Sequence, residues 1–213
     1  MYLPVQIKIC GITNSSDLAL ALELGADFIG LNLYAQSPRR VSIDDARRLL
    51  REIPEGKRVL VDVSTPTDLL QDYTSSLLFD YFQIHFDPEV SLATVSAWAG
   101  LVGQERLWLA PRIKPEEAFP ELALEFADTI LLDGYHGTKY GGTGQTGDWK
   151  QFAQLQERYP TKTWVLAGGL NPDNVKAAVS QSYAQVVDVC SGVEAAPGLK
   201  DEAKLKAFFA EVQ

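Results

Sequence analysis

Cys10 and Asp133 are the side chains of this sequence whose types and positions best suit proton transfer. Each closes an apolar run and precedes a glycine, which is typical of a residue at the end of a β-strand. A thiol acts as a base only as the thiolate, and its ordinary pKa of about 8.5 leaves little of it ionised at neutral pH. At neutral pH, a carboxyl group acts as an acid only if burial raises its pKa from the ordinary value of about 3.9. Structural alternatives remain open, a small buried side chain at Cys10 and a turn cap at Asp133.

Two further strand ends carry groups that suit a phosphate. The pairs Gly168-Gly169 and Ser191-Gly192 each follow an apolar run. Backbone N–H groups at such turns, with a helix N-terminus behind them, bind phosphate well. Each pair alone also describes an ordinary turn, but the two together favour an anion site.

Three basic side chains complete the set of candidates. Arg39 lies after the second apolar run, where its guanidinium could bind a carboxylate or could simply be solvated. His85 closes the fourth run on the same side as Gln83, and both a catalytic and a structural role are open. Arg112 could contact an anion or pair with a strand-end acid such as Asp62.

Lys8 and Asp188 suggest an ion pair inside the fold. Lys8 shares one side of its run with Cys10, and Asp188 shares one side of its run with Cys190. If the first and last strands are neighbours, we expect a Lys8–Asp188 pair that places positive charge beneath Cys10.

The elements that must position these residues alternate along the chain. We predict strands at 5–10, 27–33, 58–63, 81–85, 107–112, 129–133, 163–167 and 186–190, and helices at 16–24, 43–53, 66–77, 92–99, 115–126, 149–159, 172–180 and 201–212. Strict alternation predicts parallel strands with crossover helices. Eight units in 213 residues have the size of a compact α/β barrel of the (β/α)8 type, a single domain over residues 1–213 with its site at the C-terminal strand ends. The glycine-rich segment 134–148 follows the sixth strand there, and we expect it to be a lid or binding loop.

Composition excludes several classes of partner. The net charge of −9 without a basic block argues against nucleic acid and anionic membrane surfaces. No apolar run approaches the roughly 20 residues that span a membrane. The first strand follows Met1 too closely for a signal peptide, and two cysteines without metal-site spacing fit a reducing cytoplasm.

Seven motifs stand in order along the chain: Lys8-Ile9-Cys10-Gly11-Ile12-Thr13, Ser37-Pro38-Arg39, Gln83-Ile84-His85, Leu131-Leu132-Asp133, Gly141-Gly142-Thr143-Gly144, Ala167-Gly168-Gly169-Leu170 and Asp188-Val189-Cys190-Ser191-Gly192-Val193-Glu194. Together they resemble phosphoribosylanthranilate isomerase, the (β/α)8 enzyme of tryptophan biosynthesis. The first and fifth motifs are the most specific.

The resemblance implies a role for each motif. Cys10 matches the general base and Asp133 the general acid of an Amadori rearrangement, and Arg39 matches the contact to the anthranilate carboxylate. The phosphate-holding loops would contain Gly142, Gly144, Gly168, Gly169, Ser191 and Gly192, with His85 among the substrate-binding residues. It implies a small phosphorylated substrate and no metal or cofactor, because only protons move.

The chain also departs from the family pattern. Phe86 stands where glycine is usual after the histidine, Asp62 where asparagine is expected, and Cys190 where serine is usual. Another phosphate-binding barrel enzyme and a non-catalytic phospho-sugar-binding relative are the alternatives. The chain is expected to be a monomer or a homodimer, a choice that the sequence does not decide.

Overall fold

Eight parallel strands form a closed barrel in the computed structural model, which describes residues 4–87, 89–113, 119–133 and 148–212. The strands are Gln6–Cys10 (β1), Phe28–Asn32 (β2), Arg58–Val63 (β3), Tyr81–Phe86 (β4), Leu107–Pro111 (β5), Thr129–Leu132 (β6), Thr163–Leu166 (β7) and Val186–Val189 (β8). Each strand pairs with the next in the chain, and β1 pairs with β8 to close the barrel. The predicted (β/α)8 architecture is therefore confirmed.

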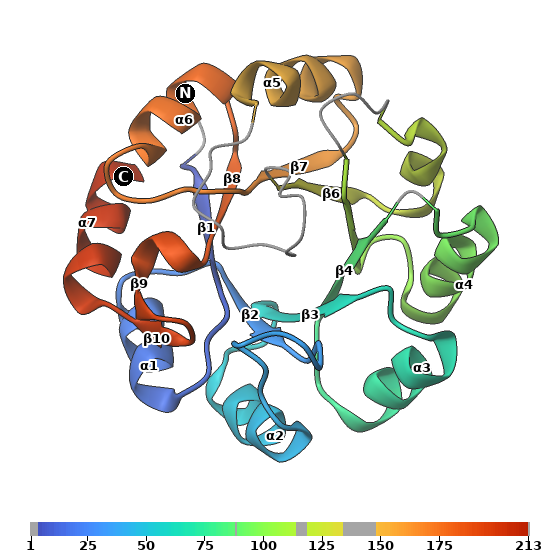
Figure 1. Ribbon diagram of the computed structural model, residues 1–213, viewed down its shortest axis with the longest axis horizontal. Coiled ribbons are helices and arrows are strands. Elements are labelled where there is room, and N and C mark those ends of the chain that lie inside the picture. The colour runs from blue at the N-terminus through green and yellow to red at the C-terminus, as the bar shows by residue number, and fades with distance from the viewer. Residues whose placement is uncertain (1–3, 88, 114–118, 134–147, 213) are drawn as a thin grey trace.

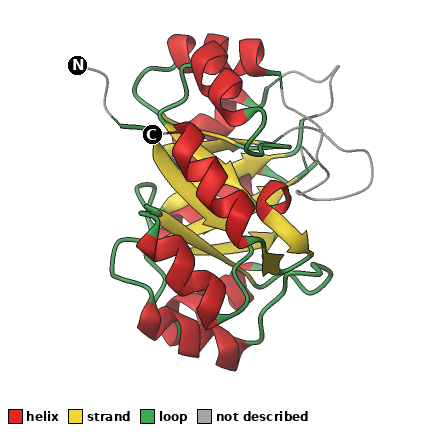
Figure 2. Ribbon diagram, turned by 90° about the vertical axis from the view of Figure 1, so that its left-hand side faces the viewer, coloured by secondary structure: helices red, strands yellow, loops and turns green. Residues whose placement is uncertain are grey.

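Helices surround the strands as an outer layer (Figures 1 and 2). They are Ser15–Glu23 (α1), Ile43–Glu52 (α2), Thr67–Ser76 (α3), Leu92–Val102 (α4), Trp149–Arg158 (α5), Val175–Ser182 (α6) and Glu202–Val212 (α7). The sequence sets several of their starts: Ser42 Oγ accepts a hydrogen bond from the Asp45 N–H at 3.0 Å, which caps α2.

The described structure differs from the predicted elements chiefly at one helix, at one helix start and in an added hairpin, and α4 also continues to Val102, three residues past its predicted end. The predicted helix 115–126 is a 3₁₀ helix over Glu121–Phe126 (η1), and residues 114–118 lie outside the described residues. Pro120 directly precedes η1, and a proline has no N–H to continue an α-helix through this point. Helix α6 begins three residues later than predicted, because Asn171 Oδ1 accepts from the Asp173 N–H and forms a turn instead.

The third difference is a short addition after β8. A 3₁₀ turn, Ser191–Val193 (η2), leads into an antiparallel hairpin of Glu194–Ala196 (β9) and Leu199–Lys200 (β10). Figure 1 shows this hairpin between α1 and α7.

The barrel interior is packed at its N-terminal end and polar at the other end. The rings of Phe28, Tyr81 and Trp108 pack together with centroids 5.0–5.7 Å apart near the strand starts. Because side chains alternate along a strand, the last inward positions of β1, β4 and β8 fall to Cys10, His85 and Cys190 at or next to the strand ends. The open end of the barrel is therefore where functional side chains gather.

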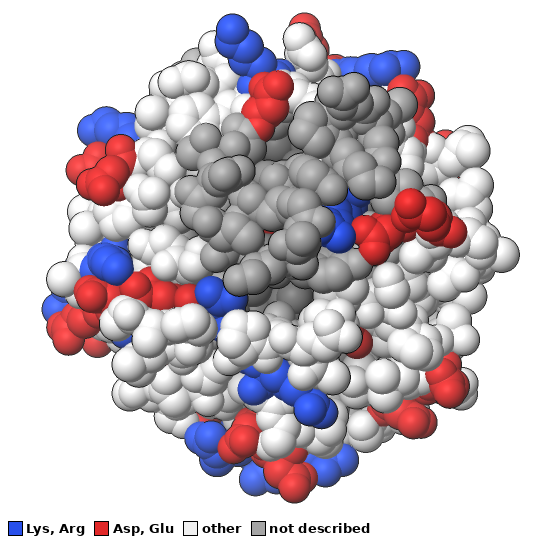
Figure 3. Space-filling view, in the orientation of Figure 1, with Lys and Arg blue, Asp and Glu red and all other residues white. Residues whose placement is uncertain are grey.

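The surface carries charges of both signs. Figure 3 shows acidic and basic side chains in small groups around the rim of the viewed face, without a continuous basic patch among the described residues. Within the described part of the chain, no helix has the length and apolar character of a membrane span.

Candidate active site

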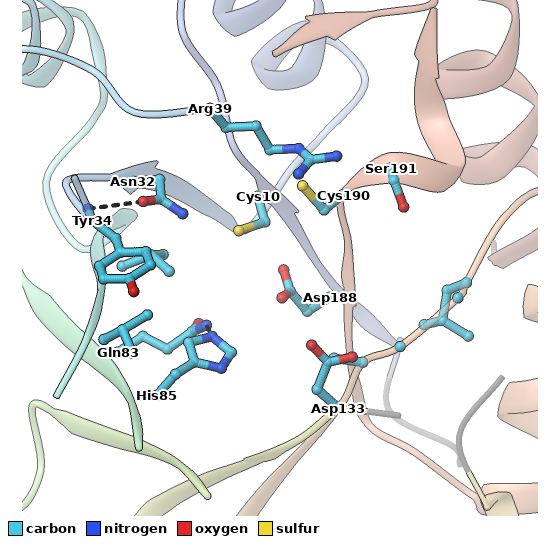
Figure 4. Close-up of a pocket in the computed structure, with 16 residues that line it drawn as sticks. Cys10, Asn32, Tyr34, Arg39, Gln83, His85, Asp133, Asp188, Cys190 and Ser191 are labelled. Atoms are coloured by element: carbon cyan, nitrogen blue, oxygen red, sulfur yellow. Dashed lines mark hydrogen bonds between the residues drawn. The ribbon is translucent and has the colours of Figure 1, made fainter. Parts of the chain in front are cut away.

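A pocket opens at the C-terminal strand ends (Figure 4). Its walls combine the last inward residues of the strands with the loops that follow them. They are Cys10, Asn32, Tyr34, Arg39, Val61, Val63, Gln83, His85, Asp133, Ala167, Gly168, Gly169, Leu170, Asp188, Cys190 and Ser191.

The Cys10 thiol lies in surroundings that favour its ionisation. Hydrogen bonding with the neighbouring Cys190 thiol lowers the pKa of Cys10 to about 7, with help from the positive charge of Lys8 and against the effect of burial. The same hydrogen bond, together with burial, raises the pKa of Cys190 well above its ordinary value. Of the two thiols, Cys10 is therefore the one that ionises more easily, while the Cys190 thiol also lies 3.8 Å from Glu194 Oε1, to which it can donate.

Lys8 supplies the positive charge beneath this thiol. Its Nζ lies 2.8 Å from Asp188 Oδ1, and its side chain is fully buried, which confirms the predicted interior pair. Burial lowers the pKa of Lys8, but Asp188 and Cys10 outweigh it and the net direction is upward, so the ammonium stays charged. Gly30 leaves the room for this arrangement, because a Cβ there would lie 3.1 Å from Lys8 Nζ and 3.2 Å from Cys10 Sγ.

Asp133 and His85 line the same pocket. Asp133 follows the end of β6, and Figure 4 shows its carboxyl group directed into the pocket, which the Cys10 thiol also lines. His85 Nε2 accepts from Gln83 Nε2 at 2.8 Å, because an amide nitrogen only donates. Burial, with a contribution from Lys8, lowers the pKa of His85 to about 4, so the ring is neutral at physiological pH.

Arg39 reaches the pocket from the loop after β2 and is bound by an internal acid. Its Nε and Nη2 atoms donate to the two carboxylate oxygens of Glu194 at 2.8 and 2.7 Å. This bidentate pair raises the pKa of Arg39 further, so the guanidinium is permanently charged. Gly11 is required beneath it, because its φ of +73° suits glycine and a Cβ there would lie 2.7 Å from Arg39 Cδ.

The loops after β7 and β8 pack against one another. Gly168 and Gly169 both have positive φ, +88° and +63°, and Asn174 Nδ2 donates to the Gly169 carbonyl at 2.9 Å. A Cβ on Gly192 would overlap the carbonyl oxygen of Leu170. Glycine at position 192 therefore permits the close approach of the two loops that were predicted to hold a phosphate.

The described side chains do not meet the requirements of a metal site. Within the ranges that the structure describes, no three His, Cys, Asp or Glu side chains come close enough to hold a metal ion.

Comparison with known proteins gives the family. The sequence matches the family described as N-(5'-phosphoribosyl)anthranilate (PRA) isomerase over residues 7–211. The chain belongs to this family.

Individual PRA isomerases agree with the chain over its length. The N-(5'-phosphoribosyl)anthranilate isomerase of Acinetobacter calcoaceticus is 37% identical over 211 residues, covering 97% of this chain and 95% of the relative. A crystal structure of a phosphoribosyl anthranilate isomerase with reduced 1-(o-carboxyphenylamino)-1-deoxyribulose 5-phosphate is 33% identical, with a TM-score of 0.80 and 98% of both chains covered. A Thermotoga maritima isomerase, a dimeric protein crystallised as generated monomers, is 34% identical with the same TM-score and coverage.

The structure brings most of the predicted site residues of this PRA isomerase together. One pocket is lined by seven of them: Cys10, Arg39, His85, Asp133, Gly168, Gly169 and Ser191. Gly192, the next residue after Ser191, packs against the Leu170 carbonyl. Gly142 and Gly144 lie outside the described residues. Arg112 pairs with Asp87 at 3.4 Å, whereas Asp62 bonds to Thr65 and the Val63 N–H, so the suggested Arg112–Asp62 pair does not form.

Two groups at this site were not among the predicted site residues. Asn32 and Tyr34, which belong to a segment that departs from the family pattern, line the pocket, with Asn32 Oδ1 accepting from the Tyr34 N–H at 2.9 Å (Figure 4). The alternation of β2 would have identified Asn32 as an inward residue at a strand end. Glu194 was noticed only as part of a motif, and nothing in the sequence pointed to Lys200, which contacts it.

Proposed function

We propose that this chain converts N-(5'-phosphoribosyl)anthranilate to 1-(2-carboxyphenylamino)-1-deoxyribulose 5-phosphate, with Cys10 as general base and Asp133 as general acid. The observation that carries the assignment is a thiol whose pKa is lowered to about 7 in the pocket that the Asp133 carboxyl group also lines. General bases are most effective when their pKa lies near the working pH.

The two groups would act in sequence on the sugar. Asp133 gives a proton to the ribose ring oxygen, the C1′–O bond breaks, and the anilinic nitrogen lone pair forms an iminium at C1′. The Cys10 thiolate then takes the proton from C2′, and the electron pair of that bond moves to give an enolamine. The enolamine tautomerises to the ketone. Each step moves only protons and electron pairs within the substrate and the two side chains.

The substrate carries two anionic groups, a carboxylate and a phosphate, and we assign each to a different part of the site. We assign Arg39 to the anthranilate carboxylate and the loops containing Gly168, Gly169, Ser191 and Gly192 to the phosphate, with Gly142 and Gly144 as expected contributors. The positive φ of Gly168 and Gly169 supports this, because such turns expose backbone N–H groups. His85, neutral at physiological pH, would act as a polar contact to the substrate.

The remaining properties follow the family. We propose that the 213 residues work as one domain on a small phosphorylated molecule, without nucleic acid or membrane partners, as a monomer or a homodimer like the Thermotoga maritima relative. Both cysteines are free, which fits the cytoplasm.

Turnover of phosphoribosylanthranilate, followed by the loss of its fluorescence, tests the assignment. We expect a fast wild type and a loss of at least about 100-fold in kcat for both Cys10→Ala and Asp133→Asn, the range of general acid–base groups. Asp87→Asn is the matched control, since this acid lies outside the pocket lining. A wild type that binds the substrate without turnover would refute the assignment and favour the phospho-sugar-binding alternative.

A further inference from the structure

The β9–β10 hairpin contributes one buried lysine, Lys200, which contacts the backbone of the two pocket cysteines. Lys200 ends β10, and its side chain is fully buried. Its Nζ donates to the carbonyl oxygens of Cys10 at 2.7 Å and Cys190 at 3.2 Å, and to Glu194 Oε1 at 3.2 Å. An ammonium has three donors, and these three acceptors use them all.

These contacts join the two strands that carry the thiols. Strands β1 and β8 are registered up to the pair Ile9–Val189, so Cys10 and Cys190 are the next pair, where the ladder ends. Beyond the end of the ladder, Lys200 Nζ donates to the Cys10 carbonyl, and it shares the Cys190 carbonyl with the Val193 N–H, which lies 3.4 Å away. Lys200 therefore fixes the backbone from which the base projects.

The same lysine connects the base to Arg39 through one carboxylate. Glu194 Oε1 accepts from Lys200, from Arg39 Nε, from the Gly198 N–H and, at 3.8 Å, from the Cys190 thiol, while Oε2 accepts from Arg39 Nη2. Burial raises the pKa of Glu194, but Arg39 and Lys200 outweigh it and the pKa falls overall. The cluster thus holds two cations against one anion.

The excess positive charge of this cluster affects both the thiol pair and the guanidinium of Arg39. It lies beside the thiol pair, where it favours a thiolate, and it lies at the guanidinium assigned to an anionic group of the substrate. Lys8 also lowers the pKa of Cys10, but its partner Asp188 raises it, so the net charge of that pair is zero and the excess positive charge lies in the Lys200 cluster.

We infer that Lys200 and Glu194 are positioning residues for the isomerisation: together they set the Cys10 base and Arg39 at a fixed separation and keep one positive charge beside them. The inference rests on the proposed roles of Cys10 and Arg39. Neither residue touches the pocket surface, so each acts through a neighbour.

Two variants that change the charge of the cluster in opposite directions test the inference. Damage to the fold would not be expected to shift the ionisation of Cys10 in opposite directions in the two variants. Lys200→Met removes a positive charge and Glu194→Gln removes a negative one. The pH dependence of Cys10 alkylation by iodoacetamide, read by mass spectrometry of the Cys10 peptide, reports the ionisation of this thiol without any need for turnover.

We expect the alkylation midpoint to rise by about one pH unit in Lys200→Met and to fall in Glu194→Gln. In kinetics we expect Lys200→Met to lower kcat about 10-fold at pH 7, and Glu194→Gln to raise KM about 10-fold because Arg39 loses its anchor. Lys206→Met is the matched control, an exposed lysine on α7 whose partner is Glu202 at 2.6 Å, and it should match wild type in every readout.

The inference is overturned if the two variants shift the midpoint in the same direction, or if neither shifts it while both lose thermal stability. If Lys200→Met does not fold, Lys200→Arg is measured in its place. This variant keeps the positive charge, so we expect its midpoint of Cys10 alkylation to match that of wild type. Wild type could fail to turn over phosphoribosylanthranilate while the alkylation midpoints of the two variants still shift in opposite directions. That result would refute the proposed reaction but support the effect of Lys200 and Glu194 on Cys10.

Discussion

Each of the two sulfur atoms at the barrel mouth affects the ionisation of the other. The resemblance to the family leads us to expect serine at position 190, and hydrogen bonding with Cys190 is the largest influence lowering the pKa of Cys10. A serine hydroxyl could donate in the same way. The departure from the family pattern therefore keeps a donor beside the base.

Replacing Cys190 tests this relation. We expect Cys190→Ala to raise the pKa of Cys10, because the donor is lost, and so to move the acidic limb of the kcat/KM profile to higher pH. Activity should then fall more at pH 6 than at pH 9, while Cys190→Ser should keep the limb near its wild-type position. Profiles that coincide for all three proteins would show that Cys190 does not set the ionisation of Cys10.

His85 gives a second pH prediction, on stability. Its pKa is about 4 in the folded protein and about 6.5 in an unfolded chain, so the unfolded state binds more protons between these values. The contribution of His85 to the free energy of unfolding is fully present above about pH 6.5 and is lost as the pH falls towards 4. We expect the free energy of unfolding in urea to fall over this window and to fall less steeply in His85→Gln.

At the scale of elements, the loops after β7 and β8 meet where glycine is the only residue that fits. We expect Gly192→Ala to push the loop after β8 away from the Leu170 carbonyl and to raise KM about 10-fold with a smaller change in kcat. Gly100→Ala is the control: no atom lies within 4 Å of a Cβ there, and alanine suits the α4 helix. A Gly192→Ala protein with wild-type KM would remove this loop contact from the binding site.

The sequence predicted the barrel strands well, but it predicted one helix and the added hairpin poorly. Strands were found because β-branched runs alternate with amphipathic ones, and the parity of Lys8 and Asp188 anticipated their pair. The predicted α-helix over 115–126 is wrong in its described part, where Pro120 precedes the 3₁₀ helix η1 and lacks the N–H that an α-helix would need there. The β9–β10 hairpin is too short, three residues and two, to leave a periodic pattern. Hence the pocket residues at strand ends were found, whereas Glu194 and Lys200 were not given their roles.

At the scale of the whole molecule, Lys8 and Asp188 join the first strand to the last. We expect Lys8→Met to lower the free energy of unfolding by about 3–5 kcal/mol, because it leaves a buried carboxylate without its partner. The double variant Lys8→Met/Asp188→Leu should recover much of this loss, since both charges are gone. Urea unfolding of the four proteins in the cycle measures the coupling, and additive losses would contradict it.

The bond from Lys200 to the Cys10 carbonyl spans 190 residues of sequence. During synthesis at roughly 5–20 residues per second, about 10–40 s separate the two residues. Over that interval the nascent chain carries its nucleophilic thiol without the lysine that fixes its backbone or the Cys190 thiol that lowers its pKa. If Cys10 and Lys200 have the roles proposed above, the proton-transfer site is complete only after residue 200 has been made, whereas all eight barrel strands end before it.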